Sequence, residues 1–293
     1  MPSIWPIETM EKGTLYIVST PIGNLEDITL RALRVLREVG LIAAEDTRRT
    51  KKLLNAYEIH TPLASLYDQN ELRKSSSLIS RINDGMDVAY VSDAGTPGIS
   101  DPGYVLVNQA IANHIRLVPV PGVSAVITAL SVSGLPMDRF VFNGFLPSKS
   151  NRRKQFLELL KNETGTLVFY ESPKRLVTAL REMEKILGNR DIVVLRELTK
   201  VFEEILRGRV SEVAQSLRDR AIKGEVTLVV AGQDKAPPQY SSEKVRARFD
   251  ELREDNGLTT RDIVDVISRE MNISRKMVYR EVLKKKELYQ ISK

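Results

Sequence analysis

The chain has 293 residues, 42% of them hydrophobic and 28% charged, which suits a globular protein of two domains or of two domains and a small appendage. It has no cysteine, two histidines, no long apolar run and no secretory signal, so we expect no disulfide framework, no metal site, no cysteine nucleophile, no membrane span and a cytoplasmic location. The net charge of +6 favours a polyanionic partner, although a charge of that size also serves solubility alone.

Strands and helices alternate from the start of the chain to residue 123. The apolar run 15–18 predicts a strand, and the polar Gly/Pro loop 19–27 after it ends in Asp27, the expected N-cap of a helix. Further strands are predicted at 41–44, 88–91 and 115–120, and helices at 70–83, 104–112 and 126–132. This alternation predicts a mostly parallel sheet.

Charged side chains follow the predicted strand 41–44 directly. Glu45 and Asp46 are costly to place in a core, so we expect this segment to line a cleft. The cations that follow are expected either to contact phosphate or to form the solvated first turn of a helix: Arg48, Arg49, Lys51 and Lys52.

The loop from Val91 to Gly103 is the centre of the predicted organisation. Three glycines and two prolines lie between Gly95 and Gly103, and Gly and Pro allow backbone N–H and C=O groups to approach a ligand. Polar groups come from Ser92, Asp93, Thr96, Ser100 and Asp101. The alternative is an ordinary strand–helix connection, but the polar groups favour a ligand site at the carboxyl end of a strand.

A second alternation follows. Strands are predicted at 140–142, 166–170, 191–195 and 225–231, and helices after the basic segment 148–154 and at 174–187 and 210–222. Two α/β units predict two sheets with a ligand cleft between them. The motifs of phosphate-binding loops, zinc proteases and serine hydrolases are absent, so the polar cleft favours group transfer by proximity with removal of one proton.

The C-terminal part is predicted to be a separate helical module. The segment 232–242 contains Pro237-Pro238 and reads as a linker. A helix that ends near Met271, a turn at 272–274 and a basic helix from Arg275 to Lys286 predict a helix-turn-helix. The alternative is an oligomerising helical hairpin.

Seven motifs in combination resemble the tetrapyrrole-methylase superfamily of S-adenosylmethionine-dependent enzymes. They are LYIVSTPIGNLEDIT (15–29), AAEDTRRT (43–50), VSDAGTPGISDPG (91–103), PGVSA (121–125), FYES (169–172), RELTK (196–200) and GEVTLVVAG (224–232). Porphyrin-modifying members carry a GxGxG-type first loop, whereas this chain has TPIGNLED, so it is similar to the branch that methylates a cytidine ribose 2′-hydroxyl of small-subunit (16S) ribosomal RNA.

The resemblance implies an α/β fold with two α/β domains (13–123 and 124–235), a cofactor cleft between them and a helical nucleic-acid-binding module (243–293). It also implies a homodimer that acts on the decoding region of the small ribosomal subunit. A methylase of a small molecule such as a porphyrin precursor is the second candidate, and a non-catalytic RNA-binding factor is the third.

The resemblance places S-adenosylmethionine against Pro21, Ile22, Ser92, Asp93, Gly95, Thr96, Ile99, Ser124, Ala125, Phe169 and Tyr170. Many superfamily members have Gly-Asp-Pro where this chain has Gly95-Thr96-Pro97, so Asp93 or the backbone is expected to take the role of that aspartate. A general base is expected among Glu45, Asp46, Glu197 and Lys200, with Asp46 and Glu197 favoured. Cations that hold phosphates or lower neighbouring pKa values are expected at Arg48, Arg196 and Lys200.

Overall fold

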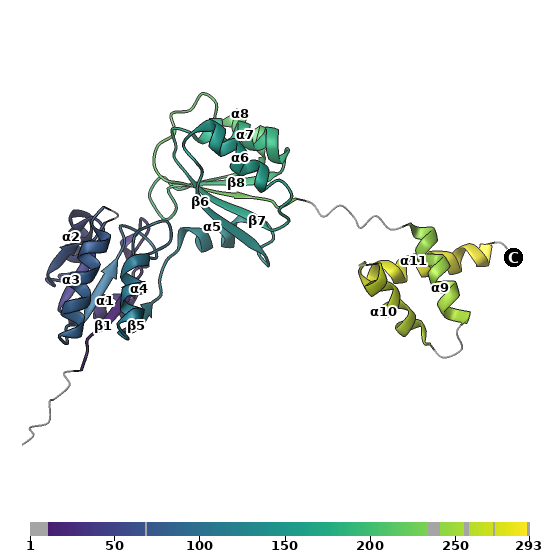
Figure 1. Cartoon of the computed structure of the whole chain (residues 1–293). Helices are drawn as coiled ribbons and strands as arrows, with labels where there is room; N and C mark the ends of the chain where they lie inside the picture. Colours follow the sequence, from purple (N-terminus) through teal and green to yellow (C-terminus); the bar gives the residue numbers. More distant parts are fainter. Residues whose placement is uncertain (1–10, 68, 234–240, 255–257, 272, 292–293) are drawn as a thin grey trace, which may run out of the picture. The chain divides into compact units, whose positions relative to one another are not determined.

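A computed structural model describes residues 11–67, 69–233, 241–254, 258–271 and 273–291. Contacts divide the chain into two units, Met1–Gln233 and Asp234–Lys293. The first unit holds two five-stranded sheets with interleaved helices, which confirms the predicted α/β class (Figure 1). No helix in the described ranges is both long and apolar enough to cross a membrane. The N-terminal segment 1–10 and Pro237-Pro238 of the predicted linker lie outside the described residues.

The first sheet is parallel throughout, with the strand order β3-β2-β4-β1-β5. Its strands are β1 (Thr14–Val18), β2 (Leu41–Ala44), β3 (Leu63–Ser65), β4 (Val88–Val91) and β5 (Arg116–Val120). Its helices are α1 (Leu30–Glu38), α2 (Thr47–Ala56), α3 (Glu71–Asn83) and α4 (Tyr104–Ala112). Strands β2 and β4 are buried at every position, because α1 and α2 pack on one face and α3 and α4 on the other.

Two details of this sheet differ from the prediction. The N-cap of α1 is Thr29, whose side chain accepts a hydrogen bond from the Ala32 N–H, so the assignment of Asp27 was wrong. Asp27 instead ends a short 3₁₀ helix, Leu25–Asp27, that Asn24 caps. Strand β3 was not predicted, because its three residues are only partly buried and give too short a pattern.

The second sheet is mixed, with the order β6-β7-β10-β8-β9. Its strands are β6 (Phe140–Phe145), β7 (Thr166–Glu171), β8 (Asp191–Arg196), β9 (Glu204–Arg209) and β10 (Val226–Val230). Strands β6 and β7 are parallel, and the other three pairings are antiparallel. Strand β10 therefore starts beside the carboxyl ends of β7 and β8, which brings three strand ends to one place.

Helices cover both faces of the second sheet (Figure 1). One face packs against α6 (Ser150–Leu159), α7 (Leu176–Leu187) and α8 (Val210–Ser216), and the other packs against α5 (Ala125–Ser133). Helix α8 ends six residues before the predicted limit of 222. Strand β9 was not predicted, since its charged residues hide the alternation of an edge strand.

Within the described ranges, the second unit holds three helices that pack as a bundle, α9 (Ser242–Glu254), α10 (Thr260–Glu270) and α11 (Arg275–Ile291). Thr259 and Asp262 form a capping box at the start of α10. Helix α9 was not predicted, and it contacts both other helices through a core that includes Val245, Phe249 and Val278. The side chains of Lys284, Lys285 and Lys286 lie outside the described residues. The domain limits 13–123, 124–235 and 243–293 stay predictions.

Candidate active site

The loops that follow β1 and β4 are joined to each other by backbone hydrogen bonds. The Thr20 N–H donates to the Gly95 carbonyl at 2.9 Å, and the Gly95 N–H donates to the Thr20 carbonyl at 2.9 Å. Gly95 has a φ of +78°, and a Cβ there would lie 3.4 Å from Cγ2 of Ile22. Glycine adopts this positive φ without strain, so the loop after β4 can turn to pair with the loop after β1 and form a single wall.

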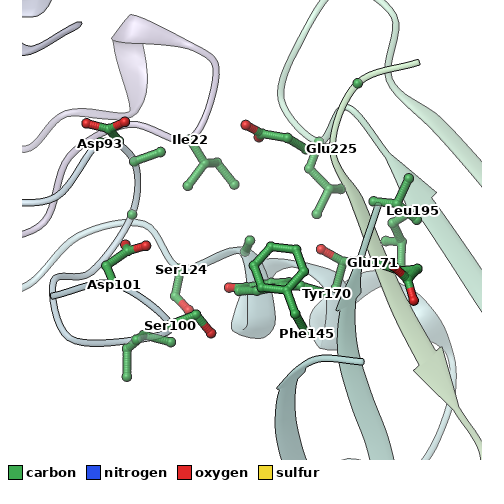
Figure 2. A pocket seen from close by; sticks show the side chains of 18 of the residues that line it. Ile22, Asp93, Ser100, Asp101, Ser124, Phe145, Tyr170, Glu171, Leu195 and Glu225 are labelled. Carbon is green, nitrogen blue, oxygen red and sulfur yellow. The ribbon is translucent and has the colours of Figure 1, made fainter. Parts of the chain in front are cut away.

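This wall borders the main pocket, which has a volume of about 430 Å³. Figure 2 shows Asp93, Ser100 and Asp101 on one side, and Phe145, Tyr170 and Leu195 of the second sheet on the other. The volume lies within the range of about 300–1,000 Å³ that is typical of small-molecule sites. The predicted residues that line it are Ile22, Glu45, Asp93, Gly95, Thr96, Ile99, Ser124, Ala125 and Tyr170.

The charged lining of the main pocket is mostly acidic. Its carboxylates come from Glu45, Asp93, Asp101, Glu171 and Glu225. The positive charge in the lining comes from Arg49, whose Nη1 lies 3.3 Å from Oδ2 of Asp93. Apolar side chains such as Ile22, Leu195 and Val226 complete the pocket. This lining suits a ligand that has a positive charge and an apolar part.

Asp93 links three segments at the edge of the main pocket. Its Oδ1 accepts a hydrogen bond from the Asp46 N–H at 2.9 Å, and its own N–H donates to Oε2 of Glu45 at 3.3 Å. Together with the ion pair to Arg49, these contacts fix the loop after β4 to the start of α2. The acidic wall is thus held in place before any ligand binds.

Glu171, at the end of β7, is a buried carboxylate beside the pocket. Its Oε1 lies 2.6 Å from Nη2 of Arg175 and accepts a hydrogen bond from the Ser172 N–H at 2.6 Å. Its Oε2 is buried and finds no hydrogen-bond partner within the described part of the chain. The Glu171 side chain is fully buried, so its carboxylate fixes the turn after β7 through Arg175 and Ser172 and is not open to a ligand in the pocket.

Tyr170 presents its ring to the pocket between two phenylalanines. Its ring centre lies 5.1 Å from that of Phe142 and 5.4 Å from that of Phe145. Burial, with the charges of Asp101 and Glu225, raises the pKa of Tyr170 to about 12. Its phenol therefore stays protonated near neutral pH and remains a hydrogen-bond donor.

Three predicted cofactor residues lie outside the lining of the main pocket. Phe169 is fully buried and packs in the core beneath α6, α7 and α8, because neighbouring residues of a strand face opposite sides of the sheet. Tyr170, the next residue, faces the main pocket. Pro21 and Ser92 line a smaller neighbouring pocket.

Two predicted catalytic residues, Asp46 and Arg48, form an ion pair at the start of α2, with the Arg48 side chain exposed and the Asp46 side chain partly buried. The Asp46 carboxylate accepts hydrogen bonds from Nε and Nη2 of Arg48 at 3.1 and 2.8 Å. The side-chain hydrogen bonds from Arg48 lower the pKa of Asp46 to about 2. Neither residue lines the main pocket.

Glu197 and Lys200 do not line the main pocket but contact Glu225, which does. Lys200 Nζ donates to Oε1 of Glu197 at 2.8 Å and to Oε2 of Glu225 at 3.0 Å. Burial alone would raise the pKa of Glu197, but the hydrogen bonds from Lys200 and from the Glu225 N–H lower it. Arg196 pairs with Glu204 at 3.0 Å. These groups hold the loop after β8, whereas Leu198, Gly224 and Glu225 form the pocket surface.

Several lining residues were not predicted, because tertiary pairing places them. Glu225, Val226 and Thr227 reach the pocket through the antiparallel position of β10, which the sequence pattern did not indicate. Phe145 faces Tyr170 because the register of β6 shifts between Phe142 and Phe145. Strict alternation from Phe142 would put Phe145 on the opposite face. Gly144, which has a φ of +61°, is the one feature of the sequence that indicates this shift, because a glycine inside a strand often marks a bulge.

Comparison with known proteins identifies the family. The family model of tetrapyrrole (corrin/porphyrin) methylases matches residues 14–214. Solved structures share the fold: uroporphyrin-III-C-methyltransferase from Thermus thermophilus has a TM-score of 0.54 at 22% identity, over 75% of this chain and 94% of that one. Diphthine synthase has a TM-score of 0.58 at 15% identity, over 75% of this chain and 90% of that one.

Relatives named ribosomal RNA small subunit methyltransferase I are much closer in sequence. The one from Halalkalibacterium halodurans is 51% identical over 230 residues, which are 78% of this chain and 80% of the relative. The one from Thermotoga maritima is 48% identical over 222 residues, which are 76% of this chain and 100% of the relative. The one from Synechocystis is 43% identical over 273 residues, or 91% of this chain and 96% of the relative. The chain therefore belongs to the tetrapyrrole methylase family and, within it, to the group of the ribosomal RNA small subunit methyltransferase I proteins.

Proposed function

We propose that this methyltransferase transfers a methyl group from S-adenosylmethionine to the ribose 2′-hydroxyl of a cytidine in small-subunit ribosomal RNA. The identity of 51% to a relative of that name, over 80% of its length, carries the proposal. The main pocket supports it, because its charged side chains suit a cationic methyl donor. The homodimer, which the family resemblance implies, and the cytoplasmic location, which composition indicates, stay predictions.

The residues of the main pocket fit S-adenosylmethionine. Asp93, Asp101 and Glu225 would stabilise its positive charges, and Ile22 and Val226 offer apolar surface to the adenine. When bound, S-adenosylmethionine supplies a methyl group on a positively charged sulfur. The pocket residues orient that methyl group, and the apolar lining excludes water from it.

A carboxylate of the pocket is proposed to accept the proton of the ribose hydroxyl. Of the predicted candidates, Glu45 lines the main pocket, whereas Asp46 and Glu197 are held by Arg48 and Lys200 outside the lining. Glu45 is also tied to the Asp93 N–H at 3.3 Å, which fixes its position. Glu45 is therefore the candidate that the geometry favours.

The first test is methyl transfer from labelled S-adenosylmethionine to three acceptors: small ribosomal subunits without the modification, the same RNA without protein, and a porphyrin precursor. Label in subunits or RNA, mapped to a cytidine ribose, is expected. Label in the porphyrin precursor instead would show that the chain is a small-molecule methylase. Cofactor binding without transfer to any acceptor would contradict the proposed acceptor.

Glu45→Gln tests the proton acceptor. We expect turnover to fall by roughly 10²–10⁴-fold, because the amide keeps the hydrogen bond to Asp93 but cannot take a proton. The dissociation constant of S-adenosylmethionine, measured by calorimetry, should change far less. Asp46→Asn is the comparison variant. If Asp46→Asn loses turnover by this factor with cofactor binding intact, and Glu45→Gln stays active, Asp46 is the proton acceptor instead.

A further inference from the structure

A second, smaller pocket adjoins the main pocket. It has a volume of about 220 Å³ and lies between the loop after β1, one side of α2 and the start of the loop after β4. We call it the loop pocket. The residues that matter below are Pro21, Leu25, Arg49, Lys52, Leu53 and Asp93. Its volume is below the range of about 300–1,000 Å³ for whole small molecules, so it suits part of one nucleotide.

The loop pocket and the main pocket share a wall. Arg49 and Asp93 line both pockets, and their side chains lie 3.3 Å apart. The Arg49 side chain is 63% exposed, so its remaining N–H donors are open to a ligand. A group in the loop pocket would therefore be the immediate neighbour of a ligand in the main pocket.

The sign of the charge changes at this wall. The main pocket has five carboxylates against Arg49, whereas the loop pocket has Arg49 and Lys52 against Asp93. An acidic site beside a basic one matches the two reactants of the proposed reaction. The methyl donor carries a positive charge, and the acceptor RNA carries phosphates.

A neighbouring side of α2 also carries two cations, but the pocket that they line does not share a wall with the main pocket. Arg49, Lys52 and Leu53 are spaced three and four residues apart, so they share one face of the helix. Arg48 and Lys51 line a separate pocket that shares no residue with the main pocket, although Arg48 is one helical turn from Lys52. Both pockets are basic, so charge alone does not distinguish them. The loop pocket is the better candidate for the acceptor because it adjoins the main pocket.

Apolar side chains of the loop pocket are open to a base or ribose face. Pro21 and Leu53 are partly buried, and Leu25 is 46% exposed. The loop that carries Pro21 is held to the loop after β8, because the Asn24 N–H donates to Oγ1 of Thr199 at 3.1 Å. The pocket is preformed, which lowers the entropic cost of binding a nucleotide.

We propose that the loop pocket binds the acceptor nucleotide, with Arg49 and Lys52 on the phosphates beside the reacting ribose and Pro21, Leu25 and Leu53 against its base or sugar. This assignment rests on the proposed function. Proteins that read single-stranded RNA recognise unstacked nucleotides, and a pocket that takes part of one nucleotide serves that purpose. Where the two pockets meet, transfer would form a bond from the 2′-oxygen to the methyl carbon and break the carbon–sulfur bond, with the sulfur leaving as the neutral thioether S-adenosylhomocysteine. The hydroxyl proton would pass to a carboxylate of the main pocket.

Lys52→Gln tests the assignment, with Lys51→Gln as the matched control. Both substitutions remove one exposed charge from α2, one residue apart. For Lys52→Gln we expect the KM for small subunits to rise roughly tenfold, the equivalent of one charge-assisted hydrogen bond. The slope of log affinity against log salt should fall by about 0.7–0.9. Lys52→Arg should restore both, and Lys51→Gln should change neither. The dissociation constant of S-adenosylmethionine should stay the same in all three.

Leu25→Ala supplies an independent test of the apolar contact. It should raise the KM for subunits without a change in salt slope, because it removes no charge. If wild-type protein methylates subunits and Lys52→Gln behaves like Lys51→Gln, the loop pocket is not the acceptor site although the proposed function stands. If wild-type protein methylates no RNA at all, the proposed function itself fails.

Discussion

Arg153 and Glu182 show how single residues hold helices α6 and α7 together. Their side chains are only 4% and 10% exposed, and Nε of Arg153 lies 2.5 Å from Oε2 of Glu182. Arg153 also donates to the carbonyls of Pro147 and Ser148, and the Ser150 hydroxyl donates to Glu182. The basic segment 148–154 thus turns one of its cations inward, where it fixes the start of α6 against α7.

Glu182→Gln should destabilise the protein by about 3–5 kcal/mol, because it leaves the buried guanidinium of Arg153 without its counter-charge. Urea unfolding of the first unit measures this. The double variant Arg153→Met/Glu182→Leu should recover most of the loss, since an apolar pair of similar volume avoids the desolvation cost. A double variant as unstable as the single one would show that the charges are not the cause.

The same pair predicts a pH dependence. Burial alone would raise the pKa of Glu182, but hydrogen bonds from Arg153 and Ser150 lower it below the unfolded value of 4.5. The stabilisation is therefore complete above that value and is lost as the pH falls through the folded-state pKa. Glu182→Gln should remove this part of the acid sensitivity, so the unfolding free energies of the two proteins should converge below pH 4.5.

At the scale of elements, the site depends on the segment that leads into β10. Gly224 has a φ of +90°, and a Cβ there would lie 2.4 Å from Cδ of Glu197. Glu197 Oε1 accepts the Glu225 N–H, so the loop after β8 and the start of β10 are built as one piece. Gly224, Glu225 and Leu198 of this piece line the main pocket.

Gly224→Ala should weaken S-adenosylmethionine binding and lower stability by about 1–3 kcal/mol, because backbone strain adds to the collision with Glu197. Gly188→Ala is the control. Gly188 has a nearly equal φ of +89°, and a Cβ there meets nothing within 4 Å. It should cost stability alone, as thermal unfolding measures, and leave cofactor binding unchanged. Equal binding losses in both variants would exclude the local contact as the cause.

Local patterns predicted most elements, but not how the elements pair. Helix α4 and strand β4 have the predicted limits, and the Gly/Pro loop after β4 lies at the pocket as expected. The antiparallel course of β10 and the shifted register at Phe145 arise from contacts between distant segments, so no local pattern carried them. The sequence favoured Asp46 and Glu197 over Glu45 as the base, and only the folded geometry separates Glu45 at the pocket from Asp46 in its ion pair.

For the molecule as a whole, the relatives differ in whether they extend beyond the length of the first unit. The Thermotoga maritima relative aligns over its full length with 222 residues, fewer than the 233 of the first unit. The Synechocystis match of 273 residues must extend into the second unit. The three-helix unit also has ion pairs among its own charges, such as Arg248 with Glu270 at 2.9 Å and Arg275 with Asp265 at 2.6 Å. Both observations indicate two units that fold separately.

A chain that ends at Gln233 should fold and bind S-adenosylmethionine as the full chain does. It should bind small ribosomal subunits more weakly and with a lower salt slope, because it lacks the cations of the second unit, Lys276 among them. Circular dichroism, calorimetry and filter binding measure these three properties. Equal affinity and an equal slope for the two chains would exclude the second unit from RNA binding.

The contact between Gly23 and Lys200 also constrains the evolution of the family. A Cβ at position 23 would lie 2.4 Å from Cγ of Lys200, and the neighbouring Asn24 is bonded to Thr199. A larger residue at one position is thus tolerated only with a smaller one at the other. The two loops, about 175 positions apart in the chain, should therefore mutate as a pair, and an alignment of relatives should show correlated residue sizes at positions 23 and 200.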